Sequence, residues 1–377
     1  MINCEKFYNK LVNKNINFFT GVPDSLLKDF CAYITDNTDS KNNIIAANEG
    51  NAIALASGYY LATGKIGLVY MQNSGLGNAI NPLTSLVDPE VYSIPMLLLI
   101  GWRGEPDMKK DEPQHIKQGK ITLKLLDTLG IKYSSLPNSM EKANEVIDDA
   151  TNYMKSFNAP YAIVVSKETF EHYNLKNEII TKYELSREEA IKLIVDKLDK
   201  DYAVISTTGM TSRELFEYRE ELGQGHSNDF LTVGSMGHSS QIALGVALSK
   251  PDKQVYCLDG DGAVIMHMGA LAIIGSQSLK NFKHIVVNNG AHDSVGGQPT
   301  VAFKIDIPSI ASACGYKLAL SAETRNEFME KLSLIKSSEG PCLLEVKVNK
   351  GHRNNLGRPT ATPIENKKKF MDFLNNH

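Results

Sequence analysis

The sequence lacks any long hydrophobic run, and this absence argues against a membrane-spanning helix. Its longest apolar segments, such as residues 95–100 and 162–165, are far shorter than the roughly 20 residues that a bilayer requires. Residues 1–7 carry charges where a signal peptide needs an apolar core. We therefore expect a protein that neither enters a membrane nor is secreted.

Cysteine is scarce, with five in 377 residues, and none of the five forms a C-x-x-C pair. An odd number cannot all pair within one chain, so neither a disulfide framework nor a zinc site is expected, and a reducing, cytoplasmic compartment fits. An excess of one charge sign is also missing, since the formal net charge is −3. Nucleic acid and anionic membranes are therefore not expected partners, whereas a local basic site for a small anion is compatible.

The chain alternates short buried strands with amphipathic helices, and its length favours two domains. This alternation predicts an α/β fold with two doubly wound parallel-sheet domains, each sheet covered on both faces. In the first half we predict strands at residues 18–20, 44–46, 67–71, 95–100 and 162–165, and helices at 51–62, 78–86, 116–129 and 140–157. In the second half we predict strands at 203–206, 254–258, 284–287 and 342–348, and helices at 187–198, 239–249, 269–278 and 323–337.

The join between the halves is predicted near residues 170–185, a polar stretch with weak periodicity. It ends at Ser186 and Glu189, whose spacing is typical of a capping box at the start of a helix. We accordingly expect a first domain at 1–170, a linker at 171–185 and a second domain at 186–377.

A metal-binding loop is indicated where the strand at 254–258 runs into Asp259-Gly260-Asp261-Gly262 and a helix follows. Glycines let the backbone approach an anion, and a helix N-terminus presents free N–H groups to it. Asp261 conflicts with a pure phosphate loop, because a carboxylate repels phosphate. The conflict disappears if Mg²⁺ lies between the carboxylate and a diphosphate.

A second oxygen ligand is expected from the end of the strand at 284–287, which runs into Asn288-Asn289-Gly290. Taken alone, Asp-Gly is more typical of a surface turn and Asn-Gly of a hairpin turn. A calcium loop is a weaker alternative, because apolar residues stand at 264–266, where an EF-hand needs oxygen-bearing side chains. The two signals together, each after a buried strand, are far more specific than either alone.

The pair resembles the G-D-G … N-N signature of thiamine-diphosphate enzymes. The resemblance implies thiamine diphosphate and Mg²⁺ as cofactors, with side-chain oxygens of Asp261 and Asn289 and the backbone carbonyl of Ala291 as metal ligands. The spacing leaves open whether Asn288 or Asn289 binds the metal. On the same resemblance, the loop residues that contact the cofactor are Gly260, Asp261, Gly262 and Ala263.

Further segments are similar to the same family. Glu49 lies in Asn48-Glu49-Gly50-Asn51-Ala52, and the resemblance implies that it meets N1′ of the aminopyrimidine; alternatively, it is an acid that favours a helix N-terminus. Gly234, Ser235 and Met236 resemble the segment that holds the cofactor bent, although methionine is also a common gap-filler in cores. Thr208 matches another cofactor-contacting strand end.

The family resemblance also implies an arrangement of domains and chains. The pyrimidine-binding domain comes first and the diphosphate-binding domain last, and at this length only these two fit. Members place each cofactor between the pyrimidine half of one chain and the diphosphate half of another. A homodimer or higher homo-oligomer, with the active site between chains, is therefore expected.

Three segments resemble a narrower subgroup, the phosphonopyruvate and sulfopyruvate decarboxylases. They are Gly21-Val22-Pro23-Asp24-Ser25, Gly101-Trp102-Arg103-Gly104 with Asp111-Glu112-Pro113-Gln114-His115, and Gly290-Ala291-His292 with Gly296-Gly297-Gln298-Pro299-Thr300. The resemblance implies non-oxidative decarboxylation of a small anionic 2-oxo acid. The single-chain form favours phosphonopyruvate, with a role in phosphonate (2-aminoethylphosphonate) biosynthesis, and sulfopyruvate is the alternative.

A substrate with a carboxylate and a phosphonate needs positive groups at its non-reacting end. The candidates are Arg103, His115, Lys117 and Lys120 in the first half and Arg353 and Arg358 in the tail. Arg103 and His115 are favoured, because they follow a buried strand in a loop rich in glycine and proline. Asp24 is a candidate for proton transfer, or else a helix cap. His292 follows the metal-ligand turn and is a candidate to face the reacting carbon.

Two other functions remain as alternatives at this stage. A carboligase of the acetolactate-synthase type has the same cofactor but is usually longer. A non-catalytic α/β nucleotide-binding or regulatory protein would need none of Glu49, Asp261 and Asn289 for chemistry.

Overall fold

The computed structural model describes residues 1–108, 111–178, 180–198 and 201–376. Residue 179, within the predicted linker, lies outside the described residues. The chain divides into two compact units: unit 1 comprises Met1–Glu178 and Ser294–Gln298, and unit 2 comprises Ile179–Asp293 and Pro299–His377.

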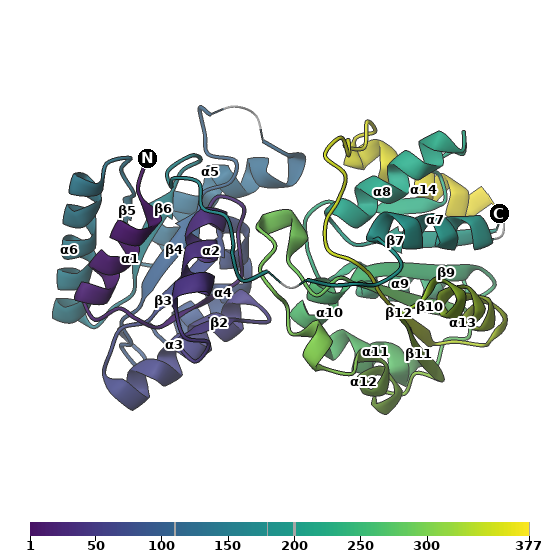
Figure 1. Cartoon of the computed structure of the whole chain (residues 1–377), viewed down its shortest axis with the longest axis horizontal. Helices are drawn as coiled ribbons and strands as arrows, with labels where there is room; N and C mark the ends of the chain where they lie inside the picture. The colour runs from purple at the N-terminus through teal and green to yellow at the C-terminus, as the bar shows by residue number, and fades with distance from the viewer. Residues whose placement is uncertain (109–110, 179, 199–200, 377) are drawn as a thin grey trace. The chain divides into compact units, whose positions relative to one another are not determined.

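Unit 1 is built on a six-stranded, all-parallel sheet (Figure 1). Its strand order is β2-β1-β3-β4-β6-β5. The strands are β1 (Phe19–Gly21), β2 (Asn43–Ile45), β3 (Leu68–Gln72), β4 (Leu97–Gly101), β5 (Lys132–Ser135) and β6 (Tyr161–Val165). The central strands β4 and β6 are buried along their whole length, as a sheet covered on both faces requires.

Two helical layers cover this sheet, and each layer contributes one hydrophobic core. One layer contains α1 (Cys4–Asn13), α2 (Lys28–Asn37) and α6 (Met140–Phe157). The other contains α3 (Glu49–Thr63), α4 (Leu76–Ser85) and α5 (Pro113–Thr128). Alternate residues along each strand enter the two cores, so that Leu97 and Leu99 pack on one side and Leu98 and Ile100 on the other.

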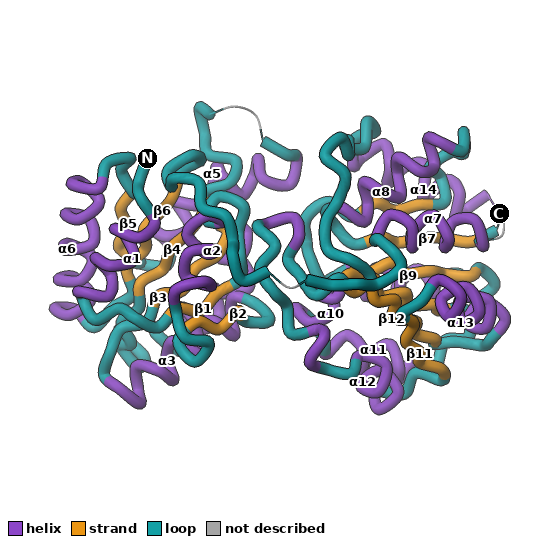
Figure 2. The backbone as a smooth tube through the Cα atoms, in the orientation of Figure 1, coloured by secondary structure: helices purple, strands orange, loops and turns teal. Residues whose placement is uncertain are grey.

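Unit 2 has a second six-stranded parallel sheet, in the order β11-β12-β10-β9-β7-β8. Figure 2 shows its strands in orange with helices on both faces. The strands are β7 (Tyr202–Ser206), β8 (Asp229–Leu231), β9 (Gln254–Gly260), β10 (Phe282–Asn288), β11 (Leu318–Ala322) and β12 (Cys342–Lys347). The short helix α10 (Asp261–Met266) begins directly where β9 ends.

The helices of unit 2 also form two layers around two cores. One core receives side chains from α7 (Arg187–Lys197), α8 (Met210–Glu221) and α13 (Arg325–Ser337). The other receives them from α9 (Ser239–Ser249), α11 (Gly269–Gln277), α12 (Ile307–Ala313) and α14 (Pro363–Asn376). The predicted fold class, two doubly wound parallel-sheet domains, is confirmed.

The two sheets share one topology, although no sequence repeat is visible. Numbered within each unit, both run 2-1-3-4-6-5. In such a sheet the order in which successive strands are added reverses between the first and third strands. Ligands of open α/β sheets bind at this point, beyond the carboxyl ends of the strands. The relevant positions are the ends of β1 and β3 in unit 1 and of β7 and β9 in unit 2.

Several elements were not predicted from the sequence. The strands β5, β8 and β11 are short or only half-buried, and so lack the continuous apolar pattern that marks the others. The helices α1, α2, α8, α12 and α14 were also not predicted. The predicted capping box is confirmed, since the Ser186 hydroxyl accepts from the Glu189 N–H and the Glu189 carboxylate accepts from the Ser186 N–H.

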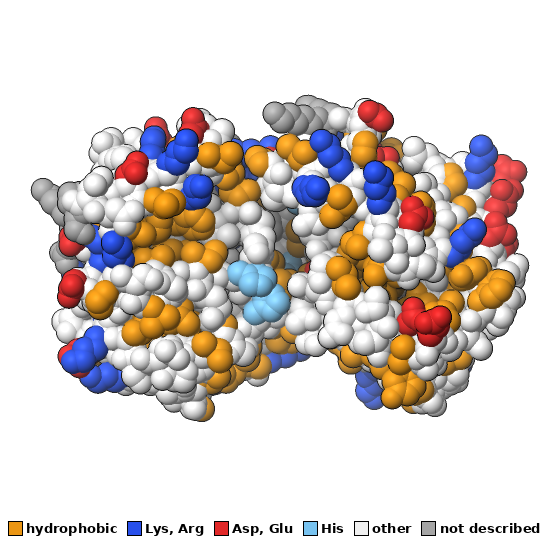
Figure 3. Space-filling model, turned by 180° about the vertical axis from the view of Figure 1, so that it is seen from behind, with side chains coloured by type: hydrophobic (Ala, Val, Ile, Leu, Met, Phe, Trp, Pro, Cys, Tyr) orange, Lys and Arg blue, Asp and Glu red, His pale blue; other side chains and the backbone are white. Residues whose placement is uncertain are grey.

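None of the helices in the described part of the chain is both long and apolar enough to cross a membrane. Hydrophobic side chains nonetheless form patches on the surface of each unit (Figure 3).

Candidate active site

The carboxyl ends of β9 and β10 bring Asp261 and Asn289 together. The two strands are neighbours, with Asp259 opposite Val286 and Gly260 opposite Val287. Asp261 and Asn289 are the first residues after these strands, and the Asn289 backbone N–H hydrogen-bonds to the Asp261 carboxylate. Two segments that looked like separate turns therefore form one site.

Asp261 is 2% exposed, so its carboxylate is almost entirely removed from water. The Thr300 hydroxyl donates to Asp261 Oδ2 over 2.5 Å. Burial raises the pKa of Asp261 to about 6, and the hydrogen bonds from Thr300 and from the Asn289 backbone oppose that rise. A buried carboxylate is costly unless donors or a cation compensate its charge, so this surrounding fits a hard divalent cation.

Asn288 and Asn289 make different contacts. Asn288 belongs to β10 and is fully buried, and its amide donates to Glu345 Oε1 over 2.7 Å. The amide of Asn289 donates to Asp293 Oδ2 over 3.1 Å, and its Oδ1 accepts from the Ala291 N–H. The Oδ1 of Asn288 likewise accepts from the Gly290 N–H over 3.0 Å, so the two asparagines differ mainly in which acid their amides bind.

The loop after β8 is held next to the end of β7. The Gly234 N–H donates to the Thr208 hydroxyl over 3.0 Å, which joins two of the residues predicted to contact a cofactor. Gly234 and Gly237 have φ values of +72° and +81°, and Ser235 has +51°. The left-handed backbone explains the two glycines, and it makes Ser235 a strained position.

Gly262 faces a small space between Met236 and His292. A Cβ at position 262 would lie 3.3 Å from both Met236 Cε and His292 Cε1, so a larger residue would fill the space. Burial lowers the pKa of His292 to about 4, so its imidazole is neutral near pH 7. Gly262 in α10 thus lies close to the side chains of Met236 and His292, which come from two separate loops of unit 2.

A buried polar network lies beneath this loop. Cys257, Asp259 and His284 are the one group of three possible metal ligands found within 4.8 Å of one another in the described ranges. His284 contacts Asp259 Oδ2 at 3.4 Å and the Tyr316 hydroxyl at 3.2 Å, while Asp259 Oδ1 accepts from Ser239. These groups satisfy one another, so we interpret the network as a support for the loop.

In unit 1, Glu49 is the first residue of α3, and the Asn48 side chain caps this helix by accepting from the Asn51 N–H. Glu49 is only 5% exposed, and Asn78 donates to its Oε2 over 2.7 Å. A Cβ at Gly75 would lie 2.4 Å from Glu49 Oε1. Its burial and the hydrogen bond from Asn78 distinguish Glu49 from a surface acid at a helix N-terminus.

Asp24, after β1, is completely buried. Gln72, at the end of β3, donates to Oδ1 and the Leu26 N–H donates to Oδ2, each over 2.8 Å. Burial raises the pKa of Asp24, while these hydrogen bonds and the charge of Arg103 oppose the rise. The contact with Leu26 caps a turn, whereas the N-cap position of α2 itself is occupied by Leu27.

Arg103 is already paired. Its guanidinium donates to both carboxylate oxygens of Asp111, over 2.7 and 2.6 Å, and to the Ser25 hydroxyl over 2.6 Å. Burial alone would raise the pKa of Asp111, but hydrogen bonds from Arg103 and the Glu112 N–H outweigh it and lower that pKa. The pair therefore carries no net charge.

His115 lies in the same region and is 7% exposed. Burial, followed by the charge of Arg103, lowers its pKa to about 4, so it offers a neutral imidazole rather than a positive charge. Its Nδ1 is buried and has no hydrogen-bond partner among the described residues. A buried nitrogen of this kind is available to a ligand that donates or, in the other tautomer, accepts a hydrogen bond.

Sequence reasoning assigned no role to several residues of these sites: Gln72, Asn78, Asp111, Asp293 and Thr300. Asp111 and Thr300 fall within the segments that resemble the decarboxylase subgroup. Asn78 ends the glycine-containing stretch Asn73-Ser74-Gly75-Leu76-Gly77-Asn78, to which no role was assigned. Gln72 binds Asp24 and Asp293 binds Arg187 only in the folded chain, because these partners are distant in sequence.

Both halves of the chain match known families. Residues 5–121 match the family described as thiamine pyrophosphate enzyme, N-terminal TPP binding domain. Residues 207–346 match thiamine pyrophosphate enzyme, C-terminal TPP binding domain.

Full-length relatives bear decarboxylase names. The chain is 32% identical to a phosphonopyruvate decarboxylase of Streptomyces viridochromogenes, over 99% of this chain and 95% of the relative. It is 31% identical to one of Streptomyces hygroscopicus, over 99% and 94%. A sulfopyruvate decarboxylase of Methanosarcina acetivorans is 27% identical, over 98% and 97%.

We predict that Asp24→Asn changes the pH dependence of stability. Because burial raises the folded-state pKa of Asp24, the ionised group destabilises the folded chain as the pH rises above its ordinary pKa of about 3.9. The wild type should therefore lose stability relative to Asp24→Asn as the pH rises above about 4, as measured by urea unfolding. The exposed Asp149→Asn serves as the control, and a difference for Asp24→Asn that does not vary with pH would contradict the prediction.

Proposed function

The chain belongs to the thiamine pyrophosphate enzyme family, and from this premise we propose that it converts 3-phosphonopyruvate to 2-phosphonoacetaldehyde and carbon dioxide. This non-oxidative decarboxylation would serve phosphonate (2-aminoethylphosphonate) biosynthesis. The observation that carries the proposal is the similarity to phosphonopyruvate decarboxylases over 99% of the chain.

The proposed cofactor is thiamine diphosphate with Mg²⁺, held in part by unit 2. Side-chain oxygens of Asp261 and Asn289 and the carbonyl of Ala291 would bind the metal. The residues proposed to contact thiamine diphosphate are Thr208, Gly234, Ser235, Met236, Gly260, Asp261, Gly262, Ala263 and Asn289. When bound, this cofactor supplies the carbon nucleophile and the electron sink that decarboxylation needs.

Glu49 would hold the proton that is exchanged with the pyrimidine end of the cofactor. Asn78 donates to Oε2 and Gly75 leaves room beside Oε1, so the carboxyl is oriented before a ligand arrives. Fixing a proton donor in this way removes an entropic cost from the reaction. Asp24 and His292 would exchange protons on the substrate side, and Gln72 would position Asp24.

Arg103 and His115 would bind the non-reacting end of the substrate. All three of the Arg103 contacts described above are to side chains that a phosphonate can replace, so we propose that substrate exchanges with Asp111 at the guanidinium. Charge-assisted, bidentate binding of this kind suits phosphonate oxygens. The neutral His115 would add a hydrogen bond.

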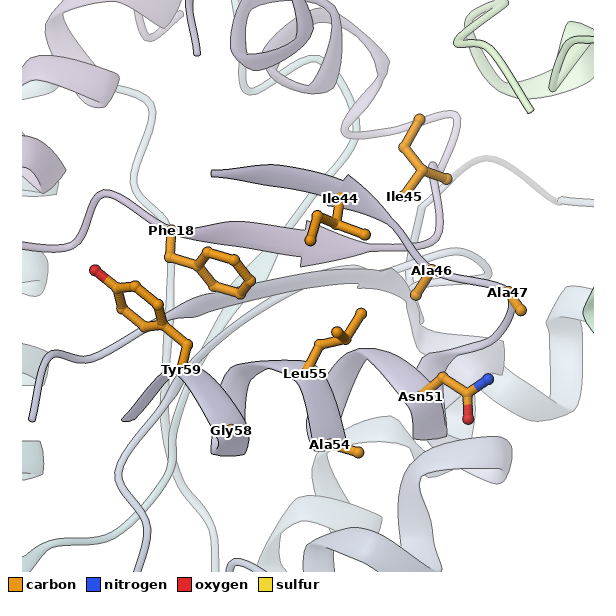
Figure 4. Close-up of a pocket in the computed structure, with 10 residues that line it drawn as sticks. All are labelled: Phe18, Ile44, Ile45, Ala46, Ala47, Asn51, Ala54, Leu55, Gly58 and Tyr59. Carbon is orange, nitrogen blue, oxygen red and sulfur yellow. The ribbon is translucent and has the colours of Figure 1, made fainter. Parts of the chain in front are cut away.

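We further propose a homodimer or higher homo-oligomer, with the active site between chains. Support comes from an apolar groove of unit 1 between the edge strand β2 and α3 (Figure 4). Its lining consists of Phe18, Ile44, Ile45, Ala46, Ala47, Asn51, Ala54, Leu55, Gly58 and Tyr59. An edge strand and a helix with exposed apolar side chains are surfaces that another chain commonly covers.

Sulfopyruvate decarboxylase is the second candidate, favoured by the similarity to the Methanosarcina acetivorans relative over 98% of the chain. The chemistry would be the same, with a sulfonate in place of the phosphonate.

A competition between substrates tests the choice. We expect a higher kcat/KM for 3-phosphonopyruvate than for sulfopyruvate or pyruvate, because the more highly charged phosphonate gains most from Arg103. Aldehyde formation, coupled to a dehydrogenase in the presence of Mg²⁺ and thiamine diphosphate, measures this. Equal or better turnover of sulfopyruvate would overturn the substrate, and turnover of none of the three would overturn the enzyme class.

Replacing Glu49 tests the chemistry. Glu49→Gln keeps the size of the side chain and a carbonyl for Asn78, but it removes the ionisable group. We expect kcat to fall by about 10²–10⁴-fold, the usual contribution of acid–base catalysis, with thiamine diphosphate still bound in calorimetry. Glu141→Gln, in the first turn of α6, is the matched control for a helix-terminal acid. Unchanged kcat in Glu49→Gln would favour a non-catalytic role.

Placing a charged side chain in the apolar groove between β2 and α3 tests whether the chain forms the proposed oligomer. Leu55 lines the groove and is 37% exposed, so Leu55→Asp should leave the fold intact but weaken association. Sedimentation velocity is expected to give a lower mass for this variant than for the wild type. Phe157→Asp, on α6 and therefore in the other helical layer, should not change the mass. A monomeric wild type would refute the proposed oligomer.

A further inference from the structure

A buried ion-pair network in unit 2 ends on the side chain of Asn289. Arg187 is the first residue of α7, and it donates from Nε and Nη2 to both carboxylate oxygens of Glu214 in α8, over 2.8 and 2.9 Å. Its remaining nitrogen, Nη1, donates to Asp293 Oδ2 over 3.0 Å. The same oxygen of Asp293 accepts from the Asn289 amide over 3.1 Å.

The charges in this network are not balanced. The Arg187 and Glu214 side chains are 6% and 1% exposed, and a bidentate pair between them is already neutral. Asp293, 9% exposed at its side chain, adds a second negative charge. A backbone donor, the Gly351 N–H, reaches the same Asp293 oxygen over 3.0 Å. An excess negative charge in so dry a region is costly unless a cation lies nearby.

The position of Asp293 also determines which way the Asn289 amide points. An asparagine amide has one end that donates and one that accepts, and the two ends have nearly the same shape. Because Asp293 binds the nitrogen, Oδ1 is turned away from it, to where the Ala291 N–H donates over 3.1 Å. A cation needs the oxygen, and an amide flipped by half a turn would present its NH₂ group instead.

We propose that Asp293, anchored by Arg187 and Glu214, is a positioning residue for a divalent cation, acting through Asn289. The proposal rests on the proposed function, since it concerns the metal of the same site. Asp293 orients the ligand oxygen of Asn289, and its excess charge favours the cation. Residues that orient a metal ligand in this way commonly change metal affinity by about 10–100-fold when they are replaced.

Mn²⁺ is a suitable probe, because it favours the same oxygen ligands as Mg²⁺ and its free concentration is measured by electron paramagnetic resonance. The full-length protein is titrated with Mn²⁺ at saturating thiamine diphosphate, without substrate. We expect Asp293→Ala to raise the Kd for Mn²⁺ by about 10–100-fold. Asp293→Asn should recover much of this loss, because its side-chain carbonyl can accept from the same three donors.

The neighbouring asparagine provides a matched control. Asn288 donates its amide to the buried Glu345 over 2.7 Å, so Glu345→Ala removes an equivalent buried acid next to an equivalent amide. This variant should lower the thermal unfolding temperature about as much as Asp293→Ala, but leave the Kd for Mn²⁺ within about threefold of the wild type. Equal loss of affinity in the two variants, or none in Asp293→Ala, would overturn the positioning role. Failure of the wild type to bind Mn²⁺ would instead overturn the proposed function.

Discussion

Parallel pairing of β9 with β10 is the constraint on which the site in unit 2 depends. Their register brings the ends of both strands to one level, so that Asp261 and Asn289 emerge side by side. Strands with apolar residues on both faces are held rigidly between two cores, and this rigidity supports a carboxylate that is nearly excluded from water.

Three carboxylates that are buried or partly buried are compensated by the same kind of contact. The carboxylates of Asp111, Glu214 and Asp229 each bind an arginine through two nitrogens, which lowers the cost of removing both partners from water. His115 and His292 avoid the cost by remaining neutral, because desolvation lowers the pKa of each to about 4. Asp261 and Asp293, two acids without such a bidentate arginine, lie beside the predicted metal loop.

The fold could be predicted to the extent that each element carries its own pattern. The central strands are apolar on both faces and were recognisable, whereas β5 reads Lys-Tyr-Ser-Ser and has no buried residue, so nothing in its sequence distinguishes it from a loop. The helix α8 was missed for a related reason. It buries polar side chains, Arg219 and Glu214 among them, whose partners lie on other elements.

The residues of the candidate site likewise divide into those that a local sequence pattern indicates and those that it does not. Asp261 and Asn289 follow strands within a short motif, and Glu49 opens a helix, so local sequence sufficed to propose them. Thr300 reaches Asp261 only because a long connection after β10 returns to the sheet, which no local pattern reveals. His115 illustrates the opposite error: its residue type suggests a positive charge, but burial, which depends on tertiary structure, makes it neutral.

The shared 2-1-3-4-6-5 order has a consequence for the order in which the chain is made. In each unit the edge strand, β5 or β11, pairs only with the strand that follows it, β6 or β12, and that later strand must enter between two existing positions of the sheet. A nascent chain that has not yet produced β6 leaves β4 as an apolar edge and β5 without a neighbour. Each unit thus stays open at one side during synthesis until its final strand is available, and a shortened chain that lacks this strand exposes surface that favours aggregation.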